Sequence, residues 1–331
     1  MMPWVHFHVG NGGWVKACCV GNIPYGNINK QSLDEIWNGE AIRNLRKQFI
    51  NNEPDNRCAV CYNNEAAGCR SIRQETNEKY AHLKDKVELT QEDGTVNHLP
   101  VYWDIRFSNV CNFRCRTCWH GASSRWFEDA KVLGNTAGKE AVITNIHDFE
   151  LFLDKMGTSL LGLEELYFAG GEPLVTEEHY QLLELLIAKG LTGVRLRYNT
   201  NFSKLSFKKY DVLELWKSFE SVELQISLDG YGEIGELIRK EMKWDKILEN
   251  ASKIKAFPHI KTKLAPTVSI LNIRHLLDLY LESLKIDLIN PEALYLNFLD
   301  RPLHYNIKAL PANLKQEITK EYGIFLNGHY R

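Results

Sequence analysis

The chain has 331 residues, of which 44% are hydrophobic and 25% charged, ordinary values for a globular protein of about two domains. Its 40 basic and 42 acidic side chains give a formal net charge of -2, so no surplus of positive charge favours binding to nucleic acid or to an anionic membrane. No apolar run approaches the roughly 20 residues of a membrane span, and no signal peptide is recognisable, so we expect a cytoplasmic protein.

The first predicted domain comprises residues 1–95. A helix is expected from Ser32 to about Phe49, because Ser32 is a good N-cap and Glu35 completes a capping box with it. A loop that carries cysteines follows, and a charged helix is expected after it, near residues 70–86.

The second predicted domain comprises residues 96–331 and follows a polar linker at 90–100. Apolar and β-branched runs predict strands, and helical periodicities separate them. Such βα units predict a parallel sheet with helices outside it, here a partial (β/α)6 barrel, whose ligand lies at the carboxyl ends of the strands. The predicted strands are 101–107, 163–168, 193–198, 221–228, 261–269 and 293–299, and the predicted helices lie near 120–132, 147–160, 176–189, 207–218, 244–256 and 272–287.

The eight cysteines are clustered, and none occurs after residue 118. Cysteines that serve as small core residues would be scattered, and a disulfide framework would suit a short secreted chain. Clustered thiols in an intracellular chain usually bind metal or perform redox chemistry, and we favour metal. The cysteines are Cys18, Cys19, Cys58, Cys61, Cys69, Cys111, Cys115 and Cys118.

Cys111, Cys115 and Cys118 form a CxxxCxxC motif directly after the predicted strand 101–107. Three thiolates on one short loop can hold three corners of a [4Fe–4S] cluster and leave one iron free to bind a small molecule. The alternative is a structural Zn²⁺ site whose fourth ligand comes from elsewhere.

At this point the sequence resembles the radical SAM superfamily, whose signature is CxxxCxxC after the first barrel strand. Three further segments follow the next predicted strands and resemble the family's cofactor-binding pieces. The GGEP segment at 170–173 resembles the one that meets the amino group of S-adenosylmethionine. Two polar segments at strand ends, 199–201 and 227–230, resemble those that contact the ribose and the carboxylate of this cofactor. Arg239 is either a partner of the methionyl carboxylate or a solvated helix charge. The resemblance therefore implies cofactor binding by Gly170, Gly171, Glu172, Pro173, Asn199, Asn201, Ser227, Asp229 and Arg239.

Residues 10–73 resemble the SPASM/twitch auxiliary-cluster region of many radical SAM enzymes, although in most relatives this region follows the barrel. One thiolate of the Cys18–Cys19 pair and three later cysteines make four soft ligands for an auxiliary [4Fe–4S] cluster, with Zn²⁺ as the alternative. Cys18 is preferred because it aligns with the family's ligand. The expected auxiliary ligands are Cys18, with Cys19 as its alternative, Cys58, Cys61 and Cys69.

The resemblance implies an enzyme with two [4Fe–4S] clusters that uses S-adenosylmethionine. Reduced flavodoxin or ferredoxin would supply an electron that cleaves this cofactor, and the resulting 5′-deoxyadenosyl radical would abstract hydrogen from a substrate. A peptide or protein is the expected substrate, to be oxidised, cross-linked or matured. The alternatives are a sugar or small metabolite as substrate and, from a different class, a non-catalytic zinc or iron–sulfur binding module.

No catalytic residue is assigned from the sequence. Four polar residues are candidates for lining the barrel, but they are equally plausible as core or rim residues. They are Asp104, Arg106, Tyr167 and Asn297.

Overall fold

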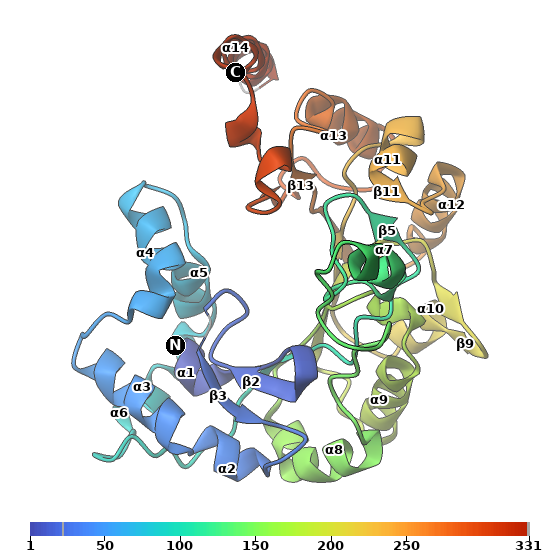
Figure 1. Cartoon of the computed structure of the whole chain (residues 1–331). Coiled ribbons are helices and arrows are strands. Elements are labelled where there is room, and N and C mark those ends of the chain that lie inside the picture. The colour runs from blue at the N-terminus through green and yellow to red at the C-terminus, as the bar shows by residue number, and fades with distance from the viewer. Residues whose placement is uncertain (22, 330–331) are drawn as a thin grey trace. The chain divides into compact units, whose positions relative to one another are not determined.

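Strands and helices alternate through most of the chain in a computed structural model, which describes residues 1–21 and 23–329 (Figure 1). The internal contacts divide the chain into two compact units that do not follow chain order. The predicted domain boundary at residues 95 and 96 stays a prediction. Unit 1 comprises Met1–Asn109, Val142–Gly170 and Glu178–Leu196, and unit 2 comprises Val110–Ala141, Gly171–Glu177 and Arg197–Arg331.

Unit 1 contains five neighbouring strands in the order β6-β4-β1-β2-β3. The first three are parallel, and β2 and β3 continue the sheet in antiparallel pairs. The N-terminal region therefore adds a strand beside the first predicted barrel strand. The alternation of histidines in this segment hides β1 from a search for apolar runs. The bounds are β1 His6–Val9, β2 Trp14–Lys16, β3 Pro24–Asn27, β4 Tyr102–Ile105 and β6 Glu165–Phe168.

The two faces of this sheet differ in polarity, because successive side chains of a strand point to opposite sides. On one face, Phe7 packs 6.4 Å from Trp37 of α2 (Leu33–Trp37), and Trp103 packs 6.4 Å from Phe152 of α8 (Phe149–Met156), measured between ring centroids. The opposite face carries buried polar side chains. They are His6, His8, Tyr102, Asp104, Glu165 and Tyr167.

The helix predicted from Ser32 to Phe49 consists of two helices, α2 and α3 (Glu40–Ile50). The capping box of Ser32 and Glu35 is confirmed at the start of α2. The break comes at Gly39, where a Cβ would lie only 2.7 Å from the carbonyl oxygen of Glu35. A continuous helix is therefore wrong.

The polar stretch 90–100 has no helix or strand, but it is bound to the N-terminal region. Asn38 donates to the carbonyl of Val96 and accepts from its N–H, both at 3.1 Å. The indole of Trp37 donates to the carbonyl of His98 at 2.7 Å. The stretch therefore packs as part of unit 1.

The other helices of the N-terminal region are α1 Met2–Val5, α4 Ala59–Ala66, α5 Ile72–Lys79 and α6 Asp85–Glu88. The charged helix predicted near 70–86 is therefore interrupted by a 3-10 turn at Ala81–Leu83.

Unit 2 contains the parallel pair β10 (Val222–Ile226) and β12 (Ile260–Leu264), and β7 (Arg195–Thr200) runs from unit 1 into unit 2. The parallel strands of both units and the helices that separate most of them along the chain confirm the predicted mixed α/β class. The helices of unit 2 are α7 Phe127–Val132, α10 Val212–Trp216, α11 Gly232–Ile238, α12 Trp244–Ile254, α13 Leu276–Lys285 and α14 Ala312–His329. The helix α9 (Glu177–Ala188) belongs to unit 1 from its second residue on.

Three predicted elements of this region differ from the structure. The segment 207–218 begins with a hairpin of β8 (Ser206–Phe207) and β9 (Tyr210–Asp211), because Lys208 turns the chain at a φ of 52°. Residues 261–269 do not form one strand, since Pro266 follows β12 and offers no N–H to a ladder. The chain resumes as β13 (Thr267–Val268), which pairs with β14 (Asn297–Phe298). The sixth predicted strand, 293–299, thus forms β14 and an isolated parallel bridge between Leu294 and Leu264 instead of one continuous strand.

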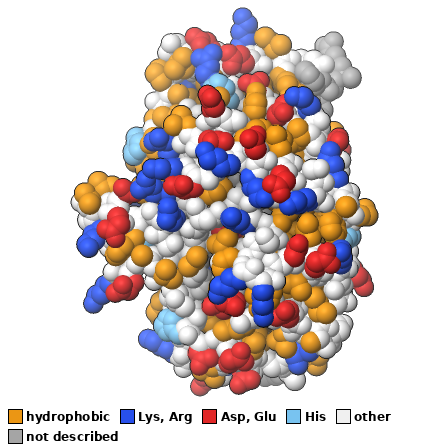
Figure 2. Space-filling model, turned by 90° about the vertical axis from the view of Figure 1, so that its right-hand side faces the viewer, with side chains coloured by type: hydrophobic (Ala, Val, Ile, Leu, Met, Phe, Trp, Pro, Cys, Tyr) orange, Lys and Arg blue, Asp and Glu red, His pale blue; other side chains and the backbone are white. Residues whose placement is uncertain are grey.

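None of the described helices is long and apolar enough to cross a bilayer. Figure 2 shows acidic and basic side chains interspersed over the face that it draws. This mixed surface agrees with the near-neutral net charge of -2.

Candidate functional site

The CxxxCxxC cysteines lie on one loop of unit 2. Cys115 is buried in the two-residue strand β5 (Arg114–Cys115), and Cys111 and Cys118 are half-buried. Burial and the neighbouring acids and thiols raise the pKa of Cys111 and of Cys115 to about 12. In the described part of the chain, no three His, Cys, Asp or Glu side chains are already gathered as ligands of one ion. Three soft donors on one loop nevertheless match the donor set of an open iron–sulfur cluster.

Hydrogen bonds from two sides hold the backbone of this loop. The indole of Trp126 donates to the carbonyl of Cys115 at 3.0 Å, and the hydroxyl of Ser123 donates to the carbonyl of Phe113 at 2.7 Å. The N–H of Arg116 donates to the carbonyl of Ile238 at 2.8 Å. None of these three bonds uses a thiol, so they hold the loop through its backbone.

The GGEP segment contains a glycine whose conformation needs the absence of a side chain. Gly170 has a φ of 118°, and a Cβ there would lie 2.9 Å from the carbonyl oxygen of Ser108. Pro173 follows as the first residue of the 3-10 turn Pro173–Val175.

Glu172 is buried and connects this segment to the end of β7. Its Oε1 accepts from the hydroxyl of Thr200 at 2.8 Å and from the N–H of Leu174 at 3.1 Å, and its Oε2 accepts from the N–H of Asn201 at 2.6 Å. Burial raises the pKa of Glu172 to about 7 in spite of these donors. Since each carboxylate oxygen can accept twice, Oε2 retains a position for one further donor such as an ammonium group.

An amide network joins the end of β7 to the cysteine loop. Asn201 donates to Oδ1 of Asn112 at 2.9 Å and accepts from the hydroxyl of Ser203 at 2.7 Å, and Asn112 donates to that hydroxyl at 2.8 Å. Asn112 and Ser203 are not among the predicted site residues, because the cysteine spacing draws attention only to the thiols. A polar residue inside the motif is the signal that points to Asn112.

Asn199 leaves a buried acceptor without a partner. Its Oδ1 is buried and makes no hydrogen bond within the described residues. A buried unsatisfied oxygen is costly, and sites that bind polar ligands carry such groups. This oxygen is the observation that fits a bound cofactor at the end of β7.

Asp229 and Arg239 form a buried ion pair behind the cysteine loop. Nε of Arg239 lies 2.9 Å from Oδ2 of Asp229, and its Nη2 donates to Oδ1 at 3.1 Å. The N–H of Thr267 also donates to this Oδ1, at 2.7 Å. The interpretation of Arg239 as a solvated helix charge is therefore wrong. Ser227, two residues before Asp229, is half-buried. Its N–H donates to the carbonyl of Thr200 at 2.8 Å.

Among the N-terminal cysteines, Cys18, Cys58 and Cys61 lie within electrostatic range of one another in unit 1. Burial, followed by the neighbouring thiols and acids, raises the pKa of Cys58 to about 11. Cys19 lies within electrostatic range of Asp104, Arg106 and Cys18. The fourth predicted ligand, Cys69, is exposed after α4.

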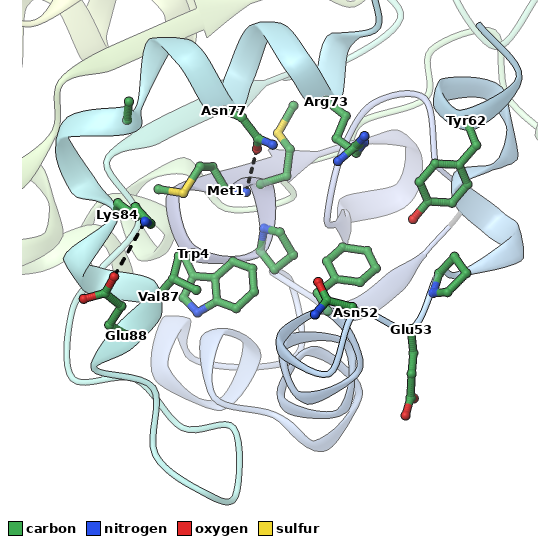
Figure 3. Close-up of a pocket in the computed structure, with 15 residues that line it drawn as sticks. Met1, Trp4, Asn52, Glu53, Tyr62, Arg73, Asn77, Lys84, Val87 and Glu88 are labelled. Carbon is green, nitrogen blue, oxygen red and sulfur yellow. Dashed lines mark hydrogen bonds and ion pairs between the residues drawn. The ribbon is translucent and has the colours of Figure 1, made fainter. Parts of the chain in front are cut away.

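A separate cavity of about 720 Å³ lies in the N-terminal region (Figure 3). Apolar side chains such as Trp4 and Tyr62 line it together with Arg73 and Lys84. Tyr62 directly follows Cys61, but no predicted ligand lines the cavity.

Comparisons with known proteins give two family matches. A model of the radical SAM superfamily matches residues 105–279, and a model of the SPASM iron–sulfur cluster-binding domain matches residues 1–62. Cys69 lies outside the second match. No curated protein sequence matches the chain.

Several solved structures are similar at low sequence identity. Streptococcus suis SuiB bound to S-adenosylmethionine is 12% identical, with a TM-score of 0.49 over 87% of this chain and 60% of that one. SuiB bound to the precursor peptide SuiA is 13% identical, with a TM-score of 0.49 over 83% of this chain and 60% of that one. TYW1 with a lysine-pyruvate adduct is 17% identical, with a TM-score of 0.31 over 56% of this chain and 59% of that one. The chain thus spans about 60% of the length of these SuiB chains.

Proposed function

The chain belongs to the radical SAM superfamily and has a SPASM iron–sulfur domain at its N-terminus, and we propose that it modifies a peptide or protein by hydrogen abstraction. The two domains imply iron–sulfur clusters and S-adenosylmethionine as cofactors. When bound and reduced, these cofactors supply a 5′-deoxyadenosyl radical that removes a hydrogen atom from the substrate.

Unit 2 supplies the residues that would hold the cofactors. Cys111, Cys115 and Cys118 would ligate the open cluster. The unpartnered Oδ1 of Asn199 and the remaining acceptor position of Glu172 would orient the polar groups of S-adenosylmethionine. The remaining predicted contacts, Gly170, Gly171, Pro173, Asn201, Ser227 and Asp229, stay proposals.

A second cluster is proposed in unit 1. Three of its expected ligands, Cys18, Cys58 and Cys61, lie within electrostatic range of one another, with Cys69 as the proposed fourth. The SPASM match supports an iron–sulfur cluster over zinc at this place. A peptide or protein is proposed as the substrate in preference to a sugar or small metabolite. Reduced flavodoxin or ferredoxin is the proposed electron donor.

The observation that carries the proposal is the set of hydrogen bonds and ion pairs that gathers Glu172, Asn201, Asp229 and Arg239 around the cysteine loop in one unit. A structural zinc site would need the thiols but not these strand-end groups. The enzyme is therefore favoured over the non-catalytic binding module.

The deciding experiment measures iron, acid-labile sulfide and zinc per chain after anaerobic reconstitution. We expect about eight irons and about eight sulfides, the content of two cubane clusters. About four irons with one zinc would make the N-terminal site structural. Zinc without iron would show that the chain is a non-catalytic binding module and not a radical enzyme.

Glu172→Gln is expected to weaken binding of S-adenosylmethionine about tenfold or more, because a charge-assisted hydrogen bond contributes about 1.5–3 kcal/mol. The affinity is measured by calorimetric titration of the reconstituted, unreduced protein. Glu177→Gln is the matched control, since Glu177 pairs with Lys208 at the surface. Equal affinities of the two variants would remove Glu172 from the cofactor site.

The substrate class needs its own test. A peptide extract from cells grown on deuterated amino acids is expected to transfer deuterium into 5′-deoxyadenosine. Transfer from a deuterated sugar extract and not from the peptides would favour the small-metabolite alternative.

A further inference from the structure

Arg239 lies between a carboxylate and a cysteine sulfur in the interior of unit 2. Only 8% of its surface is exposed, and Asp229 is 1% exposed. The Nε and Nη2 edge of the guanidinium faces Asp229, while Nη1 donates to Sγ of Cys115 at 3.8 Å. The planar guanidinium thus directs separate N–H groups to the acid and to the sulfur.

The backbone fixes this arrangement from the side of the cysteine loop. Arg239 and Cys115 are opposite residues of the antiparallel pair β5 and β11 (Arg239–Lys240). The next residue along the loop, Arg116, donates its N–H to Ile238 and its Nε to the carbonyl of Leu237 at 2.9 Å. Because the two strands are bound together, Cys115 cannot move away from the guanidinium without breaking this ladder.

We infer that Arg239 is a positioning residue that donates a hydrogen bond to the Cys115 sulfur and thereby makes the cluster on the three thiols easier to reduce. This inference rests on the proposed function, because it needs a cluster on Cys111, Cys115 and Cys118. It pairs Arg239 with the sulfur of Cys115, whereas the sequence resemblance implies that Arg239 pairs with the methionyl carboxylate.

The direction of the effect follows from charge. Reduction adds negative charge to the cluster and its sulfurs, so a nearby cation or N–H donor stabilises the reduced form and raises the potential. Asp229 opposes this effect by neutralising the guanidinium. The guanidinium is the group in contact with the sulfur, and the Asp229 oxygens contact its other edge, so the cation has the larger influence.

The experiment is a potentiometric titration of the reconstituted protein followed by EPR spectroscopy. The signal that changes when S-adenosylmethionine is added reports the cluster with the open iron and separates it from the auxiliary cluster. We expect Arg239→Gln to shift the midpoint potential of this signal to a more negative value. Lys240→Gln is the matched control, since Lys240 is the exposed neighbour in the same two-residue strand.

Asp229→Asn provides a test with the opposite sign. The amide keeps an acceptor for the N–H of Thr267 but no longer neutralises Arg239, so the potential is expected to become more positive. A merely structural role of the pair would not shift the two variants in opposite directions. If Arg239→Gln fails to load a cluster, the shift of Asp229→Asn decides alone, and a negative or absent shift overturns the inference.

The outcomes separate the inference from the proposed function. A wild-type protein with iron but without a signal that responds to S-adenosylmethionine would overturn the proposed function and the inference with it. A responsive signal whose potential is the same in wild type, Arg239→Gln and Asp229→Asn would overturn the inference alone.

Discussion

Simultaneous replacement of Cys111, Cys115 and Cys118 by alanine is expected to abolish formation of 5′-deoxyadenosine. The open cluster cannot assemble without its thiolates, while the five N-terminal cysteines are untouched. The iron content is therefore expected to fall from about eight to about four per chain. Chromatography of the reduced reaction mixture measures the nucleoside, and a colorimetric assay measures the iron.

This variant is expected to fold, because the bonds that hold the loop are made by its backbone. The carbonyl of Cys115 accepts from Trp126, and the N–H of Arg116 reaches Ile238, with alanine as with cysteine. The matched control replaces Cys18, Cys58 and Cys61 instead and should still cleave S-adenosylmethionine. If the first variant made 5′-deoxyadenosine, the assignment of the open cluster to these cysteines would be wrong.

The parts of the site that could be predicted are those whose residues are neighbours in the sequence. The CxxxCxxC loop is one such part, and the glycine with a φ of 118° at position 170 is another. Their chemistry depends on local spacing and local backbone conformation, which a single sequence displays. The capping box of Ser32 and Glu35 was predictable for the same reason.

The partners of these residues could not be predicted, because they come from distant parts of the chain. Asn112 meets Ser203 across 91 residues, and Arg239 meets Cys115 across 124 residues. Tertiary contacts of this kind also decide where elements end. The helix that begins after Ser32 ends at Trp37, and the side chain of the next residue, Asn38, binds the distant Val96.

The strand β1 illustrates a second reason why parts of the structure could not be predicted from the sequence. His6 and His8 alternate with Phe7 and Val9, a pattern that describes a strand with one polar face. All four residues are nevertheless buried, because Asp104 of β4 lies opposite His8 and the chain around Ala17 covers His6. Polarity by itself therefore gives the wrong expectation of exposure, and the buried histidines become intelligible only with their partners.

The pair of His8 and Asp104 leads to the second prediction, a large loss of stability in Asp104→Asn. Nδ1 of His8 lies 2.8 Å from Oδ2 of Asp104, and their side chains are 5% and 0% exposed. Arg106 approaches the other oxygen at 3.5 Å. Removing one partner of a buried pair typically costs about 3–5 kcal/mol, which we expect here in urea unfolding of the metal-free chain at pH 7.

The matched control for this loss is Glu88→Gln. Glu88 faces Lys84 at 3.9 Å on the surface of α6, with side chains 69% and 79% exposed. Such a pair contributes at most about 0.5 kcal/mol, because water screens it and its side chains are mobile. Equal unfolding midpoints for Asp104→Asn and Glu88→Gln would show that the buried carboxylate contributes no more than the exposed one.

The pH dependence identifies the charge as the cause. Burial alone would raise the pKa of Asp104, but His8 and Arg106 outweigh it and hold the pKa well below its usual value. A lowered pKa means that the folded chain favours the ionised carboxylate, so its stabilisation is complete above the ordinary value of about 3.9 and is lost as the pH falls below it. The difference between wild type and Asp104→Asn should therefore shrink as the pH falls below about 4.

The free energies of unfolding of wild type and Asp104→Asn have to be compared as a difference, because the neighbouring His6 also titrates. Burial lowers the pKa of His6 to about 4, so this histidine stays neutral in the folded chain and costs stability once the pH falls below its ordinary value of about 6.5. Wild type and Asp104→Asn share most of this loss, which largely cancels between them. A difference that persisted undiminished well below pH 4 would mean that packing, and not the ionised carboxylate, stabilises this face of the sheet.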